Sequence, residues 1–69
     1  MKTRVRHQFA GTIREIAKGR VSTEVTTEIV PGMSVVAVIS SRSADALGLR
    51  VGKAAHALIK ASSVIVAVD

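Results

Sequence analysis

Strict alternation of two residue types between positions 21 and 29 constrains the fold of this chain more than any other feature. Side chains of a β-strand point alternately to opposite faces, so a period of two predicts a strand with one apolar face and one wet face. The alternating residues are β-branched Val21, Thr23, Val25, Thr27 and Ile29 and polar Ser22, Glu24, Thr26 and Glu28. Because only 1% of the residues are aromatic while 48% are hydrophobic, the core must consist of Val, Ile, Leu and Ala, which favours strands.

An earlier strand is expected where Val5, Phe9 and Ile13 share one parity. Gly11 between them offers a bend or bulge, as in strands that curl around a small barrel. Pro and Gly at positions 31 and 32 favour a tight turn, because Pro presets φ and Gly tolerates a positive φ. The expected elements of this half are a strand through residues 5–13, a turn at 17–19, the strand at 20–29, a turn at 30–32 and a strand at 33–40.

The period changes after Ser40. Serines at positions 41 and 43 can cap a helix, the following residues are Ala and Leu, and Gly48 suits a left-handed stop. One or two helical turns are therefore expected within residues 41–49. The remaining chain reads as a loop at 51–53 and two strands at 54–60 and 63–68, joined at Ala61-Ser62.

Three strands, a short helix and two strands are the layout of the OB-fold. The sequence thus predicts one all-β domain over residues 1–69, a five-stranded OB-like Greek-key barrel with one short helix between strands 3 and 4. A domain of this size buries only about 60% of its unfolded surface and is marginal alone. The chain has no cysteine, so disulfides cannot staple it, and partner subunits are the expected substitute.

The net charge of +5 is concentrated near the start of the chain. Six of the ten basic residues fall within the first 20 positions, where Glu15 is the only acid. This imbalance suggests an anionic partner, which could be nucleic acid, an anionic membrane surface or a small oxyanion. The charge pattern alone is equally compatible with a solvated face. No apolar run approaches the roughly 20 residues of a membrane span, so a cytoplasmic protein is expected.

A lysine and two serines interrupt the apolar run near the end of the chain. The segment Leu58-Ile59-Lys60-Ala61-Ser62-Ser63-Val64 combines a cation, two hydroxyls and backbone N–H groups. All three kinds of donor can share the oxygens of one anion. We therefore expect an oxyanion-binding site here.

Several segments resemble the molbindin family, whose members are small molybdate-binding proteins made of one Mop or TOBE module. The resemblance covers essentially the whole chain, and its most specific part is the Lys-Ala-Ser-Ser-Val ending. The segments that carry it are Arg6–Gly11, Val38–Ser40, Leu47–Leu49, Gly52-Lys53 and Ile59–Val64.

The resemblance implies a homohexamer, a trimer of dimers, that binds molybdate or tungstate between subunits without chemical change and serves intracellular molybdenum storage and homeostasis. Matching the family's motifs assigns anion binding to Arg6, Ser40, Lys60, Ala61 and Ser62. Less firmly matched are Arg4, Val5, His7, Ser43 and Ser63. Arg4 and His7 stand where the family usually has serine and asparagine, which puts those contacts in doubt and leaves the ligand preference open.

Other classes of function have weaker support. No phosphate loop or catalytic triad is present, so an enzyme is not expected, nor is a cofactor. His7 and His56 are isolated and do not indicate a metal ion bound directly by the protein. Non-specific binding of nucleic-acid phosphates stays open as an alternative, although Phe9 is the only aromatic residue available for base stacking. A structural assembly module with incidental anion binding is the other alternative.

Overall fold

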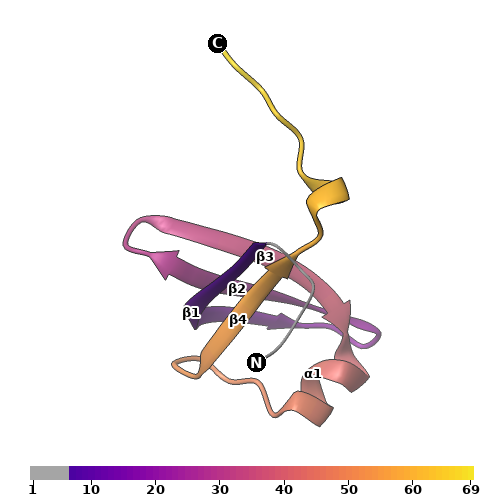
Figure 1. Ribbon diagram of the computed structural model, residues 1–69. Coiled ribbons are helices and arrows are strands. Elements are labelled where there is room, and N and C mark those ends of the chain that lie inside the picture. Colours follow the sequence, from indigo (N-terminus) through magenta and orange to yellow (C-terminus); the bar gives the residue numbers. More distant parts are fainter. Residues whose placement is uncertain (1–6) are drawn as a thin grey trace.

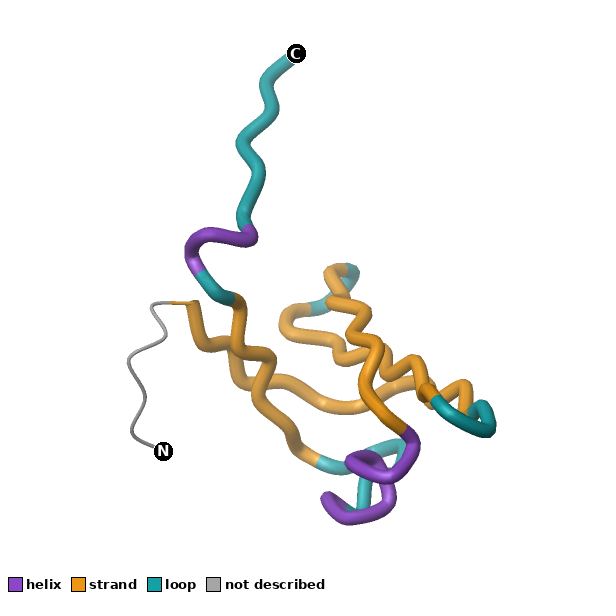
Figure 2. Tube along the Cα trace, turned by 90° about the vertical axis from the view of Figure 1, so that its right-hand side faces the viewer, coloured by secondary structure: helices purple, strands orange, loops and turns teal. Residues whose placement is uncertain are grey.

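The protein is built on one antiparallel sheet that curls into a half-barrel (Figures 1 and 2). The computed structural model describes residues 7–69. The strands lie in the order β3-β2-β1-β4, a short helix stands between β3 and β4, and a 3-10 turn follows β4. The elements are β1 His7–Lys18, β2 Ser22–Val30, β3 Met33–Ser40, α1 Ser41–Leu47, β4 Ala54–Ile59 and η1 Ala61–Ser63.

The alternation that predicted a strand is confirmed in β2. Thr23, Val25 and Thr27 are buried on the concave face, whereas Glu24 is exposed. The predicted turn before β3 is also confirmed, because Gly32 adopts a φ of 82°. A positive φ of this kind is what glycine accepts without steric cost.

A sharp change of partner along β1 produces the curl. Residues 7–12 of β1 pair with β4, whereas residues from Thr12 onward pair with β2. Gly11 lies at this corner, where an added Cβ would stand 2.4 Å from the carbonyl oxygen of Glu28. Arg14 is an extra residue between the paired positions Ile13 and Glu15. The expected bend is thus confirmed. Gly11, where the backbones of β1 and β2 approach closely, and the β-bulge at Arg14 lie close together in β1.

The predicted end of the helix at Gly48 is confirmed, but the N-cap is neither of the predicted serines, Ser41 and Ser43. Ser40 is the N-cap, and its side chain accepts a hydrogen bond from the Ser43 N–H. Gly48 ends the helix in the left-handed conformation, with a φ of 64°. Ser41 attaches the helix to the turn between β1 and β2, because its N–H donates to the Val21 carbonyl at 2.8 Å and its hydroxyl to the Gly19 carbonyl at 2.7 Å.

The core of a single copy is small. Among residues 7–69, only Ile13 and Thr23 are fully buried, and Val25 and Ala44 retain 6% exposure. Many large apolar side chains of β3 and of the C-terminal segment are exposed instead. One copy therefore leaves apolar surface uncovered, as expected for a chain that depends on partners.

The predicted fifth strand is wrong for a single copy. Residues 61–63 form the turn η1 rather than a strand join, and β4 ends at Ile59 rather than at Lys60. Residues 64–69 are extended, but they pair with no strand of the described chain and leave the sheet (Figure 1). The β propensity of this segment was read correctly, but a strand also needs a neighbour for its backbone groups, and η1 directs the segment away from the sheet. Among the described elements, no helix is long and apolar enough to cross a membrane.

Candidate oxyanion-binding residues

The segment predicted to bind an anion forms an exposed turn at the end of β4. The Lys60 carbonyl accepts from the Ser63 N–H at 2.9 Å, and the Ala61 carbonyl accepts from the Val64 N–H at 3.3 Å. The N–H groups of Ala61 and Ser62 begin the turn and therefore have no acceptor within it. The turn offers one ammonium group, two hydroxyls and these N–H groups on the surface.

One further predicted residue lies beside this turn. His7 pairs with Ile59, the residue that precedes Lys60, and its side chain is half-buried. The pairing therefore places the backbone of His7 beside the start of the turn. The predicted residues Arg4, Val5 and Arg6 lie outside the described part of the chain.

Ser40 and Ser43 form a second group of hydroxyls at the start of α1. The Ser40 hydroxyl donates to the Ser43 hydroxyl oxygen at 2.8 Å and accepts from the Ser43 N–H at 3.0 Å. The hydroxyl hydrogen of Ser43 remains available to a ligand, whereas that of Ser40 is already used. Both side chains are exposed. The geometry therefore favours Ser43, the less firmly matched of the two, as the outward donor.

These two groups are held at opposite ends of the sheet within one copy (Figure 1). Lys60 follows Ile59, which pairs with His7, the first residue of β1. Ser40 pairs with Ser22, and the next residue of β2 pairs with Lys18, the last residue of β1. A single copy therefore does not bring the turn and the serine pair together around one ion.

The electrostatic surroundings of Lys60 suit an anion. Within residues 7–69, the ion pairs join Arg14 to Glu28 at 3.0 Å and Lys18 to Asp45. Lys60 belongs to neither pair, so its charge is not compensated by a described carboxylate. The carboxylate nearest in sequence to the serine pair, Asp45, is bound by Lys18.

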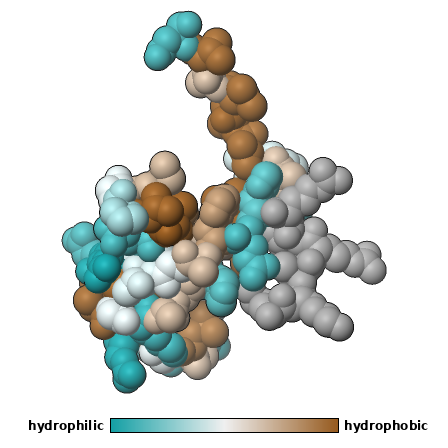
Figure 3. All heavy atoms as spheres, turned by 60° about the vertical axis from the view of Figure 1, so that its left-hand side comes forward, coloured by the Kyte–Doolittle hydropathy of each residue, from teal (hydrophilic) through white to brown (hydrophobic). Residues whose placement is uncertain are grey.

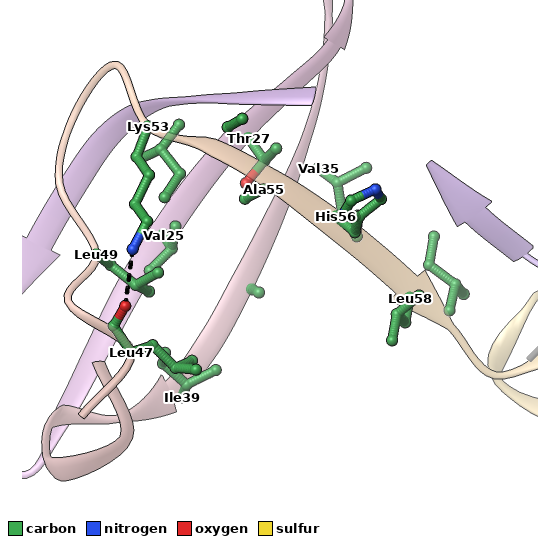
Figure 4. Close-up of a pocket in the computed structure, with 15 residues that line it drawn as sticks. Val25, Thr27, Val35, Ile39, Leu47, Leu49, Lys53, Ala55, His56 and Leu58 are labelled. Carbon is green, nitrogen blue, oxygen red and sulfur yellow. Dashed lines mark hydrogen bonds between the residues drawn. The ribbon is translucent and has the colours of Figure 1, made fainter. Parts of the chain in front are cut away.

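A groove not foreseen from the sequence lies on the concave face of the sheet, with a cavity volume of about 440 Å³ (Figure 4). Its walls come from β3 and β4, and Ile13 and Val25 line its floor. Lys53 lies at one end, but its ammonium group donates to the Leu47 carbonyl at 2.9 Å and the Gly48 carbonyl at 3.3 Å. Lys53 therefore closes the helix end, and the rest of the groove is mainly apolar.

Comparison with known protein families identifies the family of this chain. The TOBE domain family matches residues 3–66. The chain belongs to the TOBE domain family. The predicted resemblance to Mop and TOBE proteins is thereby confirmed.

Relatives of this TOBE domain have names that refer to molybdenum. The molybdenum transport protein ModE of Herbaspirillum seropedicae is 45% identical over 69 residues, which is 100% of this chain but 26% of that protein. A probable molybdenum-pterin-binding protein of Haemophilus influenzae is 38% identical, with 100% of both chains covered. The structure of a molybdate-binding protein from Sporomusa ovata has a TM-score of 0.89 and 33% identity, covering 97% of this chain and 98% of that one.

The length of the relatives varies. This TOBE domain spans about a quarter of ModE, and the whole length of the Haemophilus protein. The names describe transport and binding rather than a reaction, and the prediction that the chain is not an enzyme is confirmed by these relatives.

Proposed function

We propose that this protein binds molybdate or tungstate as an intact oxyanion, without chemical change. The observation that carries the proposal is the exposed Lys60–Ser63 turn, in which a cation without a described carboxylate partner adjoins hydroxyl and amide donors. Molybdate is a tetrahedral dianion, so it needs several converging donors and compensating charge. The names of the relatives from Sporomusa ovata and Haemophilus influenzae support the same ligand element.

The ligand site lies between copies of the chain in this proposal. The turn provides Lys60, Ala61, Ser62 and Ser63, and a second copy provides Ser40 and Ser43. The separation of the two groups at opposite ends of one sheet supports an intersubunit site. A homohexamer built as a trimer of dimers, expected from the family resemblance, would repeat such a site by symmetry.

The N-terminal residues add charge in this proposal. Arg6 directly precedes His7 in the sequence, and His7 pairs beside the turn. We include Arg6 as a second cation, with Arg4, Val5 and His7 as supporting contacts. One lysine does not neutralise a dianion, so a second positive group should raise affinity substantially.

The cellular role proposed is storage and homeostasis of molybdenum in the cytoplasm. A protein that binds an oxyanion without changing it can buffer the concentration of that ion. The name of the Haemophilus relative includes a pterin, so the ligands tested should include the free oxyanion alone. Binding to nucleic-acid phosphates is a weaker proposal, because Phe9 is the sole aromatic side chain and is 38% exposed.

Calorimetric titration of the full chain tests the proposed function. Molybdate and tungstate should release heat with a stoichiometry set by the assembly, whereas sulfate and phosphate should bind at least ten-fold more weakly. Absence of heat with both metal oxyanions, at concentrations where ultracentrifugation shows the assembled protein, would refute the proposal.

A further inference from the structure

Arg42 stands beside the serine pair on the solvent side of α1. The buried residues of this helix are Ser41 and Ala44, which share the side that packs on the sheet. With 3.6 residues per turn, the two residues between them, Arg42 and Ser43, lie on the outer side. Both are exposed. A long cationic side chain therefore accompanies the serine hydroxyl that is available to a ligand.

A second arginine is held next to this helix start by two hydrogen bonds. Ser41 donates its N–H to the Val21 carbonyl and its hydroxyl to the Gly19 carbonyl. Arg20 is the residue between those two acceptors, and it is exposed. The turn that carries Arg20 and the helix start that carries Arg42 are therefore adjoining segments of the surface.

The charges of these two arginines have no carboxylate partner in the described chain. Figure 3 shows hydrophilic side chains dispersed among hydrophobic ones over the body of the molecule, so the pairing of a charge is more informative than its exposure. The ion pairs within residues 7–69 join Arg14 to Glu28 and Lys18 to Asp45. Arg20 and Arg42 belong to neither pair, so both charges are available to an anion from outside the chain.

Arg42 occupies a position of α1 where a positive charge is unfavourable. The first turn of a helix carries partial positive charge and favours acidic residues, but α1 has none there and carries Arg42 instead. The N–H groups of Ser41 and Ser43 already bind the Val21 carbonyl and the Ser40 hydroxyl, so an anion at this place would be bound by side chains. A residue that opposes the local preference of its helix is typical of a functional position.

The serine side of the proposed site also contains a carboxylate that must be offset. Ser40 pairs with Ser22, and Glu24 lies two residues further along β2, on the same face of the sheet. Glu24 is exposed and belongs to neither ion pair of residues 7–69. Its charge would repel a dianion bound at Ser43. Binding on this side therefore requires a cation from the same surface.

We propose that Arg42 is a ligand of the oxyanion, contributed by the copy that provides Ser43, and that Arg20 raises the positive potential around it. This inference rests on the proposed function. A guanidinium group can donate two parallel N–H groups to two oxygens of one tetrahedral anion. With Lys60 from one copy and Arg42 from the other, both sides of the intersubunit site contribute positive charge to the dianion.

Charge reversal at Arg42 tests the inference, because affinity should fall while stability does not. In calorimetric titration of the full chain, Arg42→Glu should weaken molybdate binding roughly ten-fold or more. Its urea midpoint should equal or exceed that of the parent, since an acid suits the first turn of a helix. Arg42→Lys keeps the charge but not the paired N–H donors, so it should lose less affinity. The control Arg50→Glu makes the same charge change at an exposed loop position and should leave affinity within about two-fold in 0.15 M salt, which screens distant charges.

Three results would overturn the assignment of Arg42 and leave the proposed function standing. Parent-like affinity of Arg42→Glu would remove this residue from the site. Equal loss of affinity in Arg42→Glu and Arg50→Glu would mean that only the net charge of the protein matters. A lower urea midpoint of Arg42→Glu, alongside its weaker binding, would mean that Arg42 serves the fold. By contrast, a parent protein that releases no heat with molybdate or tungstate refutes the proposed function, and the role of Arg42 with it.

Discussion

The hydroxyl oxygens of Thr23 and Ser41 lie 2.8 Å apart in a buried contact that ties β2 to the first residue of α1. Ser41→Ala should lower the free energy of unfolding by about 1–3 kcal/mol, because it leaves the Thr23 hydroxyl and the Gly19 carbonyl with one partner fewer. Urea denaturation of Ser41→Ala, Thr23→Val and the double variant measures the coupling. If the two single effects simply add, the contact does not stabilise the protein.

Gly11 is predicted to tolerate no side chain. A Cβ at this position would stand 2.4 Å from the Glu28 carbonyl oxygen and 2.9 Å from a methyl group of Thr27. Gly11→Ala should therefore force β1 and β2 apart and cost about 1–3 kcal/mol in urea denaturation. The control is Ala10→Ser, an exposed position on the same strand, which should change stability by less than about 0.5 kcal/mol. Equal effects at the two positions would contradict the close approach.

Lys60→Ala should weaken molybdate binding about ten- to hundred-fold, because a charge-assisted hydrogen bond contributes roughly 1.5–3 kcal/mol. The circular dichroism spectrum and the urea midpoint should not change, since Lys60 is exposed and lies outside the core. Arg50→Ala removes an exposed positive charge from a loop away from the turn and should leave affinity within about two-fold. Parent-like affinity of the Lys60→Ala protein would remove the turn from the site.

Substitution of the two serines at the start of α1 should affect different properties: stability at Ser40 and molybdate affinity at Ser43. Ser40→Ala removes the N-cap and should cost about 0.5–2 kcal/mol of stability. Ser43→Ala keeps the backbone N–H that Ser40 binds, so it should reduce molybdate affinity with a smaller loss of stability. Titration and urea denaturation of both variants test this. Unchanged affinity in Ser43→Ala would exclude its hydroxyl as a ligand donor.

Local patterns predicted most of the sheet, and the missing part has a physical explanation. The alternation through Thr23, Val25 and Thr27 located β2, and Gly48 located the end of the helix, because each depends on nearby residues only. The segment after Ser63 has equally strong β propensity, yet its state depends on a neighbouring strand that one copy does not supply. Propensity indicates that a segment can be extended but not which edge it joins.

The candidate site was predictable as residue types but not as an arrangement. Lys60 and the serines were identifiable because a cation and hydroxyls are unusual inside an apolar run. That Ser40 uses its own hydroxyl hydrogen on Ser43 depends on the cap geometry at the start of α1. That the two groups occupy opposite ends of the sheet depends on the register of three strand pairs. The groove itself had a signal in sequence, the run of apolar residues Val35–Ile39 in β3, three of which line it.

The core of one copy is small, and Ile13 and Thr23 are the only fully buried side chains of residues 7–69. This has a consequence for the lifetime of the protein in a cell. If copies cover one another's exposed apolar side chains, dilution removes interactions that make each copy stable, so the melting temperature rises with protein concentration. Chains in small number would be open to proteolysis, while chains in large number would protect one another. The lifetime of each molecule would then depend on how many others have been made.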